Sequence, residues 1–199
     1  MAAGADDELL PAPSSSRRSP GFDIRPLAGG LYSLHLWGPL PTGWAAHLSL
    51  GLARSGVGIL RGQAGRRDGR WDGELHLRPT PGGPQPDSLD YARLLSRRGT
   101  AATLVPLELV EFRVLPLLGT LALEVIGRDT LGFLGGLLGR LAFLSLFPEE
   151  MRIETRDGLA IDHFRLRALG GRTPSLDAAR ALDRMLLDLG PVRPAIVSE

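Results

Sequence analysis

The chemically most suggestive segment of this chain is a short turn that joins an alternating apolar segment to a helix-like one. It reads Asp129-Thr130-Leu131-Gly132-Phe133. A glycine lets a ligand approach the backbone closely, N–H groups at a helix N-terminus favour a carboxylate, and the Asp129 carboxylate could hold an ammonium group. The turn would therefore suit a zwitterion. The structural alternative is that Asp129 caps the helix and Gly132 allows close helix packing.

Two histidines form the second candidate. His35 and His76 are predicted on the outward face of neighbouring strands with Glu74 close by, which could make a metal site or an acid–base pair. In the second copy of this segment, described below, the equivalent positions are Glu124 and Arg165, an ordinary cross-strand ion pair. Polar pairing on an open sheet face is the favoured interpretation, and we expect no metal.

Composition removes several classes of function. The chain of 199 residues has no cysteine, which excludes disulfide scaffolds, thiolate metal sites and cysteine nucleophiles. Its 23 basic residues are all arginine and face 22 acids, so lysine chemistry and a strongly basic nucleic-acid surface are also excluded. With no catalytic constellation in view, we expect a non-enzymatic protein without a cofactor or a nucleic-acid partner.

An internal repeat organises the chain. The segment from Gly38 to Trp44 aligns with that from Gly127 to Phe133 at an offset of 89, and the same offset relates the two Arg-Asp-Gly turns that begin at Arg67 and Arg156. Repeats at a fixed period indicate two related structural units. Gly43 and Trp44 then mark a possible degenerate site in the first unit, where Leu40 takes the place of Asp129.

Periodicity predicts the same elements in both units. For the first we expect strands at 31–37, 58–65, 71–78 and 107–114, and helices at 44–56 and 88–97, the second capped by Ser88. For the second we expect strands at 120–126, 151–156 and 160–168, helices at 131–146 and 176–189 with Ser175 as a cap, and a weak last strand at 194–198.

A βαββαβ series places both helices on one face of the sheet, because right-handed crossovers return on the same side. The predicted fold class is therefore α+β: two ferredoxin-like sandwiches in tandem, with helices on one face of an antiparallel sheet. We expect a disordered arm at 1–20, a first domain at 21–115 and a second at 116–199. The last strand would be incomplete, or the 107–114 strand of the other unit would supply it.

The segment from Thr130 to Phe147 is apolar enough to raise a membrane-spanning alternative, since it has a single charge and small residues spaced by four. Charged flanks and the absence of a positive-inside asymmetry favour a buried helix instead. The N-terminal segment is acidic and lacks an apolar stretch, unlike a signal peptide. We expect a cytoplasmic protein with no membrane contact.

Three segments of the second unit resemble the ACT domain: 121–134, 153–158 and 162–167. They resemble especially the tandem ACT repeats at the C-terminus of bacterial uridylyltransferases and double-ACT regulators of the glycine cleavage repressor type. That group usually has a basic residue and a proline where this chain has Thr130-Leu131. The resemblance implies a non-catalytic module that binds an amino acid or similar effector at a domain interface, or that serves only for dimerisation.

Two functions follow from this resemblance. The first is a regulatory protein that senses an amino acid or similar metabolite through residues 129–133, self-associates and passes the signal to a partner protein. The second is an interaction or dimerisation scaffold with a degenerate ACT fold and no ligand, which Leu40 and Thr130-Leu131 favour. The apolar helix predicted at 131–146 calls for a packing partner in either case.

Overall fold

The computed structural model describes residues 19–96 and 105–190. Within these ranges the chain forms eight strands and four α-helices, which confirms the α+β class. In chain order the elements are β1 Gly21–Pro26, β2 Tyr32–Gly38, α1 Trp44–Arg54, β3 Val57–Arg67, β4 Arg70–Pro79, α2 Tyr91–Ser96, β5 Leu109–Leu117, β6 Thr120–Arg128, α3 Phe133–Phe143, β7 Leu146–Arg156, β8 Leu159–Ala168 and α4 Leu176–Leu187.

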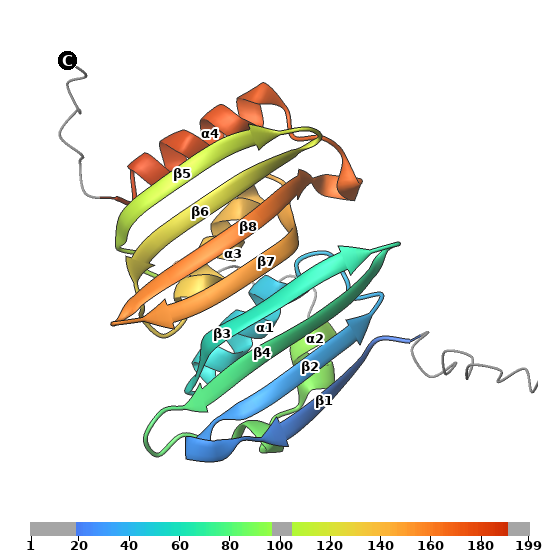
Figure 1. Ribbon diagram of the computed structural model, residues 1–199, viewed down its shortest axis with the longest axis vertical. Helices are drawn as coiled ribbons and strands as arrows, with labels where there is room; N and C mark the ends of the chain where they lie inside the picture. Colours follow the sequence, from blue (N-terminus) through green and yellow to red (C-terminus); the bar gives the residue numbers. More distant parts are fainter. Residues whose placement is uncertain (1–18, 97–104, 191–199) are drawn as a thin grey trace, which may run out of the picture.

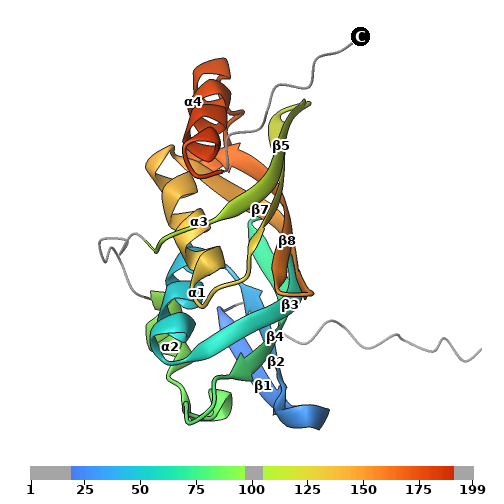
Figure 2. The same cartoon turned by 90° about the vertical axis from the view of Figure 1, so that its left-hand side faces the viewer.

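All the described strands belong to one antiparallel sheet with the order β1-β2-β4-β3-β7-β8-β6-β5 (Figure 1). The helices cover one face of this sheet, and the other face is uncovered (Figure 2). Alternation along the strands explains the two faces: in β8, for example, Ala160, Phe164 and Leu166 are buried while His163 and Arg165 are exposed.

The repeat is visible in the element bounds and in the contact between the two halves. β3 and β7, β4 and β8, and α1 and α3 begin and end 89 residues apart. Where the halves meet, β3 pairs with β7 so that Arg61 lies opposite Glu154 and Gly65 opposite Glu150, with Gln63 opposite Arg152 at the centre. Positions 61 and 150 are equivalent in the repeat, and so are positions 65 and 154, so the repeat converts the first of these pairs into the second. The seam therefore has the self-complementary geometry of a two-fold interface.

The predicted βαββαβ series is wrong, because each half has the series ββαββα. The strand predicted at 107–114 does not close the first half. It overlaps β5, which pairs with β6 through a hairpin at Leu118-Gly119, where Gly119 has a φ of 75°. This strand therefore closes the second half, which confirms the alternative expectation that the 107–114 strand supplies it. A two-residue hairpin costs little loop-closure entropy compared with a return to the far edge of the first half. The predicted domain boundary at residue 115 falls inside β5.

β1, which the sequence analysis missed, has the same role in the first half. Phe22, Ile24 and Pro26 lie opposite Leu36, Leu34 and Tyr32 of β2. In β5 the residues Phe112, Val114 and Pro116 lie at the corresponding places beside β6. This second match has an offset of 90 rather than 89, because Pro26 and its partner Tyr32 are six positions apart in the chain whereas Pro116 and its partner Leu121 are five apart. Each half thus has the strand order of a βαββαβ sandwich in which the last strand comes first in the chain.

Several element ends differ from the predicted ones. The helix predicted at 131–146 ends at Phe143, because Ser145 adopts a φ of 56° and β7 already begins at Leu146. Ser88 does not cap α2: its hydroxyl donates to the Gln85 carbonyl, while Asp90 accepts from the Arg93 N–H. Ser175 does cap α4, accepting from the Ala178 N–H at 3.1 Å. The strand predicted at 194–198 lies outside the described residues.

No helix in the described ranges is long and apolar enough to cross a membrane. The apolar face of α3 is covered from within the chain, because α1 packs against it. Leu48 and Leu52 of α1 and Leu137 and Leu141 of α3 have no exposed surface. The approach is closest at Gly135, where an added Cβ would lie 2.7 Å from Leu50 Cγ and 2.9 Å from the Leu50 backbone nitrogen.

This close approach predicts a cost for any side chain at position 135. We expect Gly135→Val to lower the free energy of unfolding by about 1–3 kcal/mol, because the helices must move apart to admit the side chain. Urea unfolding followed by circular dichroism would measure the change. The matched control is Gly65→Ala in β3, where an added Cβ meets nothing within 4 Å. Equal effects of the two substitutions would contradict the close packing of α1 on α3.

Candidate functional site

The predicted turn forms the link between β6 and α3, and backbone hydrogen bonds hold both of its ends. The Asp129 N–H donates to the Gly158 carbonyl at 2.9 Å, and the Phe133 N–H donates to the Thr130 carbonyl at 2.9 Å. Gly132 is the N-cap of α3 with a φ of 93°, a left-handed conformation that favours glycine. No side chain caps this helix, so the interpretation of Asp129 as the helix cap is wrong.

The start of α3 leaves backbone donors without partners inside the helix. The Phe133 N–H is bonded to Thr130, and the Gly136 N–H donates to the Gly132 carbonyl at 2.8 Å. The N–H groups of Leu134 and Gly135 lie between them in the first turn, where an α-helix supplies no acceptor. They carry part of the positive end of the helix dipole.

This turn borders a cavity of about 140 Å³ between the two halves of the sheet. All five predicted residues, Asp129 to Phe133, line it. The first half contributes Ser49 of α1 and residues 57–60 of β3, and the second half contributes β7 and β8. The space is about ten times what one buried water needs, so a small organic molecule fits the volume. The cavity therefore exists only where the two repeats meet.

Two carboxyl groups belong to its lining. Asp129 is half-buried, and its Oδ2 accepts a hydrogen bond from Thr155 Oγ1 at 3.0 Å. Asp162 of β8 is 1% exposed, and neither of its carboxylate oxygens has a hydrogen-bond partner among the described residues. A buried carboxyl without a partner is costly to a fold and is an expected feature of a binding or active site.

Both carboxyl groups hold their protons more tightly than usual. Burial raises the pKa of Asp162 to about 8; the nearby charge of Asp129 adds to this rise, and the Glu154 backbone, which lies near the carboxyl without reaching hydrogen-bond geometry, opposes it. Burial also raises the pKa of Asp129, with the hydrogen bond from Thr155 acting in the opposite direction. At neutral pH the cavity thus contains an acid poised to ionise when a positive charge enters.

The repeat places a second cavity at the pseudo-equivalent position, beside Gly43 and Trp44, and it is nearly filled. Its volume is about 50 Å³. Trp71, which takes the place of Ala160, lies edge-on to Trp44 at a ring-centroid distance of 5.2 Å. Leu40 and Gly73 take the places of Asp129 and Asp162, and an added Cβ at Gly73 would lie 2.5 Å from Ala64 Cβ. Side chains therefore occupy most of the space in the first half that is open beside Asp129 in the second.

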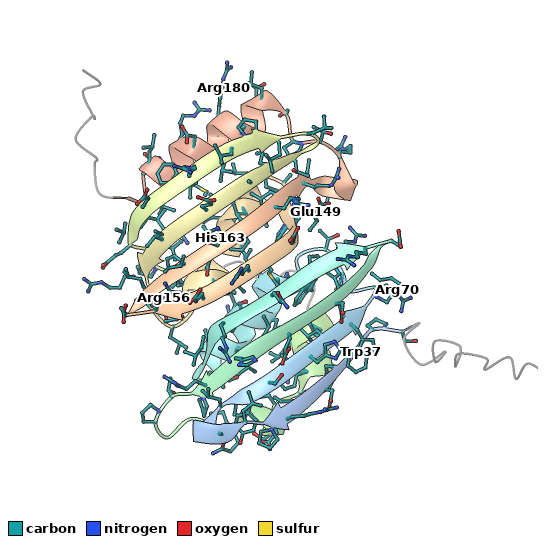
Figure 3. All side chains as sticks on the ribbon, viewed as in Figure 1. Trp37, Arg70, Glu149, Arg156, His163 and Arg180 are labelled. Atoms are coloured by element: carbon teal, nitrogen blue, oxygen red, sulfur yellow. The ribbon has the colours of Figure 1, made fainter. Side chains whose placement is uncertain are left out.

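His35 and His76 line neither of these cavities. They extend from β2 and β4 on the sheet face opposite the buried Leu34, Leu36, Leu75 and Leu77, the face on which Figure 3 labels His163. His35 Nε2 lies 2.7 Å from Asp72, and His76 Nε2 lies 3.5 Å from Glu74. The pairing of Glu124 with Arg165 predicted for the second half is wrong: the strand register sets Glu124 opposite His163, and Arg165 pairs with Glu150. Among the described residues, no group of three or more His, Asp or Glu could hold a metal ion.

A shallow groove of about 370 Å³ crosses the seam on this uncovered face. Several of its charged side chains have polar partners. Glu74 accepts from the Ser33 hydroxyl at 2.6 Å, which lowers the pKa of that carboxyl together with the nearby histidines, and Arg61 Nε donates to His76 Nδ1 at 3.1 Å. These partnered groups are typical of a solvated sheet face, and the cavity beside Asp129 is the stronger candidate site.

Comparison with known proteins adds nothing to this geometry, because no protein-family model, curated protein or solved structure matches the chain.

Asp162 and Thr155 are the site residues that the search for candidate functional residues missed. Asp162 did leave a signal, since it occupies an inward position of an alternating strand whose other inward residues, Ala160, Phe164 and Leu166, are apolar. An acid in such a row cannot be explained by packing. Thr155 left no such signal, because only the tertiary structure brings its hydroxyl to Asp129.

The raised pKa of Asp162 predicts a fold that loses stability as pH rises. The folded state holds the proton to about pH 8, whereas an unfolded aspartate releases it near pH 3.9. Between these values each pH unit should lower the free energy of unfolding by up to about 1.4 kcal/mol. Asp162→Asn should remove this slope and be more stable than the natural chain at pH 8. Denaturant unfolding from pH 4 to 8 tests this, and equal slopes for both proteins would contradict it.

Proposed function

We propose that this chain is a cytoplasmic, non-catalytic tandem ACT-like regulatory protein that senses an amino acid or a similar small metabolite in the cavity beside Asp129. The observation that carries the proposal is the cavity itself. It lies between the two repeats, and its lining includes all five residues of the predicted turn and the unpartnered carboxyl of Asp162.

The polar groups of the cavity match the two ends of an amino acid. The free N–H groups at the start of α3 suit an α-carboxylate, as helix N-termini do. Asp129 and Asp162 suit an α-ammonium group, and charge-assisted hydrogen bonds of this kind are the strong ones. Ile59, Leu131 and Ile153 supply apolar wall for a short side chain. The strand order of each half is compatible with an ACT-like sandwich whose last strand comes first.

A position between the halves gives such a ligand a means of regulation. Atoms of α1 and β3 from the first half and of α3, β7 and β8 from the second would all contact it. A ligand that contacts both halves binds their present arrangement more tightly than any other arrangement. It stabilises the present one by the difference between these binding free energies. Sensing would then consist of a change in the rigidity or angle of the seam, which a partner protein could read.

Calorimetric titration of the full chain against the common amino acids tests the sensing proposal. We expect at least one saturable ligand, and Asp129→Ala should weaken it by about 10–100-fold, the value of a charge-assisted hydrogen bond. Asp68→Asn is the matched control, since Asp68 is an exposed turn residue of the first half outside the cavity. An absence of heat across the whole panel would refute sensing of an amino acid.

A second candidate, the interaction scaffold without a ligand, is favoured by exposed apolar side chains. Phe143 at the end of α3 is 73% exposed, and Leu176 and Leu187 of α4 are 64% and 58% exposed. Exposed apolar groups of this size can mark a protein contact. Sedimentation of the natural chain and of Phe143→Ser would separate the candidates: self-association that this change abolishes, in a chain that binds no metabolite, supports the scaffold.

A further inference from the structure

We propose that the preferred ligand of the interface cavity is a small organic ammonium ion with a short apolar tail, bound with its nitrogen between Asp129 and Asp162. This inference rests on the part of the proposed function that places a small-molecule ligand in this cavity, and it specifies the chemical class of that ligand. It differs in the net charge of the ligand: a monocation, rather than a zwitterion, is the species the cavity should hold most tightly.

The first support is the charge of the described lining. Its charged side chains, Asp129 and Asp162, are both acids, and they come from different elements, the turn after β6 and the strand β8. The charge of Asp129 adds to the raised pKa of Asp162, so ionisation of both carboxyl groups is unfavourable unless a cation lies between them. A zwitterion brings a carboxylate with its ammonium, and that carboxylate has only the partial charge of a helix N-terminus to meet it.

The second support is the lack of partners for Asp162. Both of its oxygens are free of hydrogen bonds among the described residues, although the group is almost wholly buried. An ammonium group has three N–H donors, which is enough to reach both carboxyl groups and the Thr155 hydroxyl. The apolar wall formed by Val57, Ile59 and Ile153 then suits a hydrocarbon tail.

The third support is the contrast with the pseudo-equivalent cavity. There Leu40 and Gly73 replace the two acids, and Arg66 replaces Thr155. The two cavities descend from one repeat and share a backbone framework, so a structural need of the fold would keep the acids in both. Acids retained in the open cavity alone point to a role in binding a cation.

Entry of a cation into the cavity should change the protonation of Asp162. The residues opposite Asp162 are Val125 on β6 and Ile153 on β7, and Ser49 of α1 lies across the cavity, so Asp129 is the titratable side chain that faces it in the described lining. Burial keeps the Asp162 proton in place up to about pH 8, and an ammonium ion would lower that pKa. Binding near pH 7 should therefore release close to one proton.

The experiment is calorimetric titration of the full chain with n-butylammonium, 1-butanol and n-butyrate at pH 7, repeated in buffers of different ionisation enthalpy to count protons. We expect butylammonium to bind at least about tenfold more tightly than either isostere, with release of close to one proton. Asp162→Asn should abolish the proton release and weaken butylammonium at least about tenfold. Asp68→Asn should change neither quantity.

Each contrary result overturns the proposal. Butanol or butyrate binding as tightly as butylammonium would do so, and so would a proton count of zero for the natural chain, a measurement that does not depend on any variant folding. An amino acid that titrates where butylammonium does not would overturn the preference for a cation and leave the proposed sensing intact. Butylammonium binding with silence from every amino acid would support the cation and refute amino-acid sensing.

Discussion

The antiparallel pairing of β3 with β7 is the contact on which the rest of this structure depends. It joins two four-stranded halves into one sheet, and its self-complementary register sets α1 against α3 on the covered face. The close crossing of these helices at Gly135 follows from that register. Without the seam, the cavity beside Asp129 would lack the wall that α1 and β3 provide.

Because of the two-fold geometry, the seam forms two equivalent cavities. Their side chains differ between the two halves. In the first half Trp71 and Trp44 fill the space and contribute apolar packing to the core. In the second half Ala160 leaves room, and two carboxyl groups occupy positions that are apolar or glycine in the first. Burying Asp162 costs stability at neutral pH, a cost that the filled cavity avoids. A single chain with two halves can specialise in this way, whereas an identical pair could not.

Much of the fold could be predicted from the sequence, and the error in the order of the strands has one cause. The strands β2, β3, β4, β6 and β8, all four helices and the helix cap at Ser175 follow from alternation, spacing and turn residues, which are local properties. The partner of β5 is not local. The 89-residue repeat is strong from Gly38 onward, whereas Phe22-x-Ile24-x-Pro26 and Phe112-x-Val114-x-Pro116 match over three residues at a different offset, too weakly to mark the start of each half.

By itself, the sequence determined the two-fold repeat, the turn from Asp129 to Phe133 and the loss of its counterpart near Leu40, because each depends on residues close together in the chain. Only the tertiary structure decided that the repeats share one sheet, that Thr155 donates to Asp129, and that Asp162 faces the same cavity without a partner. These are contacts across strands and across the seam. The energies of these contacts depend on which distant segments are buried against one another, and residue spacing within a short segment does not specify that.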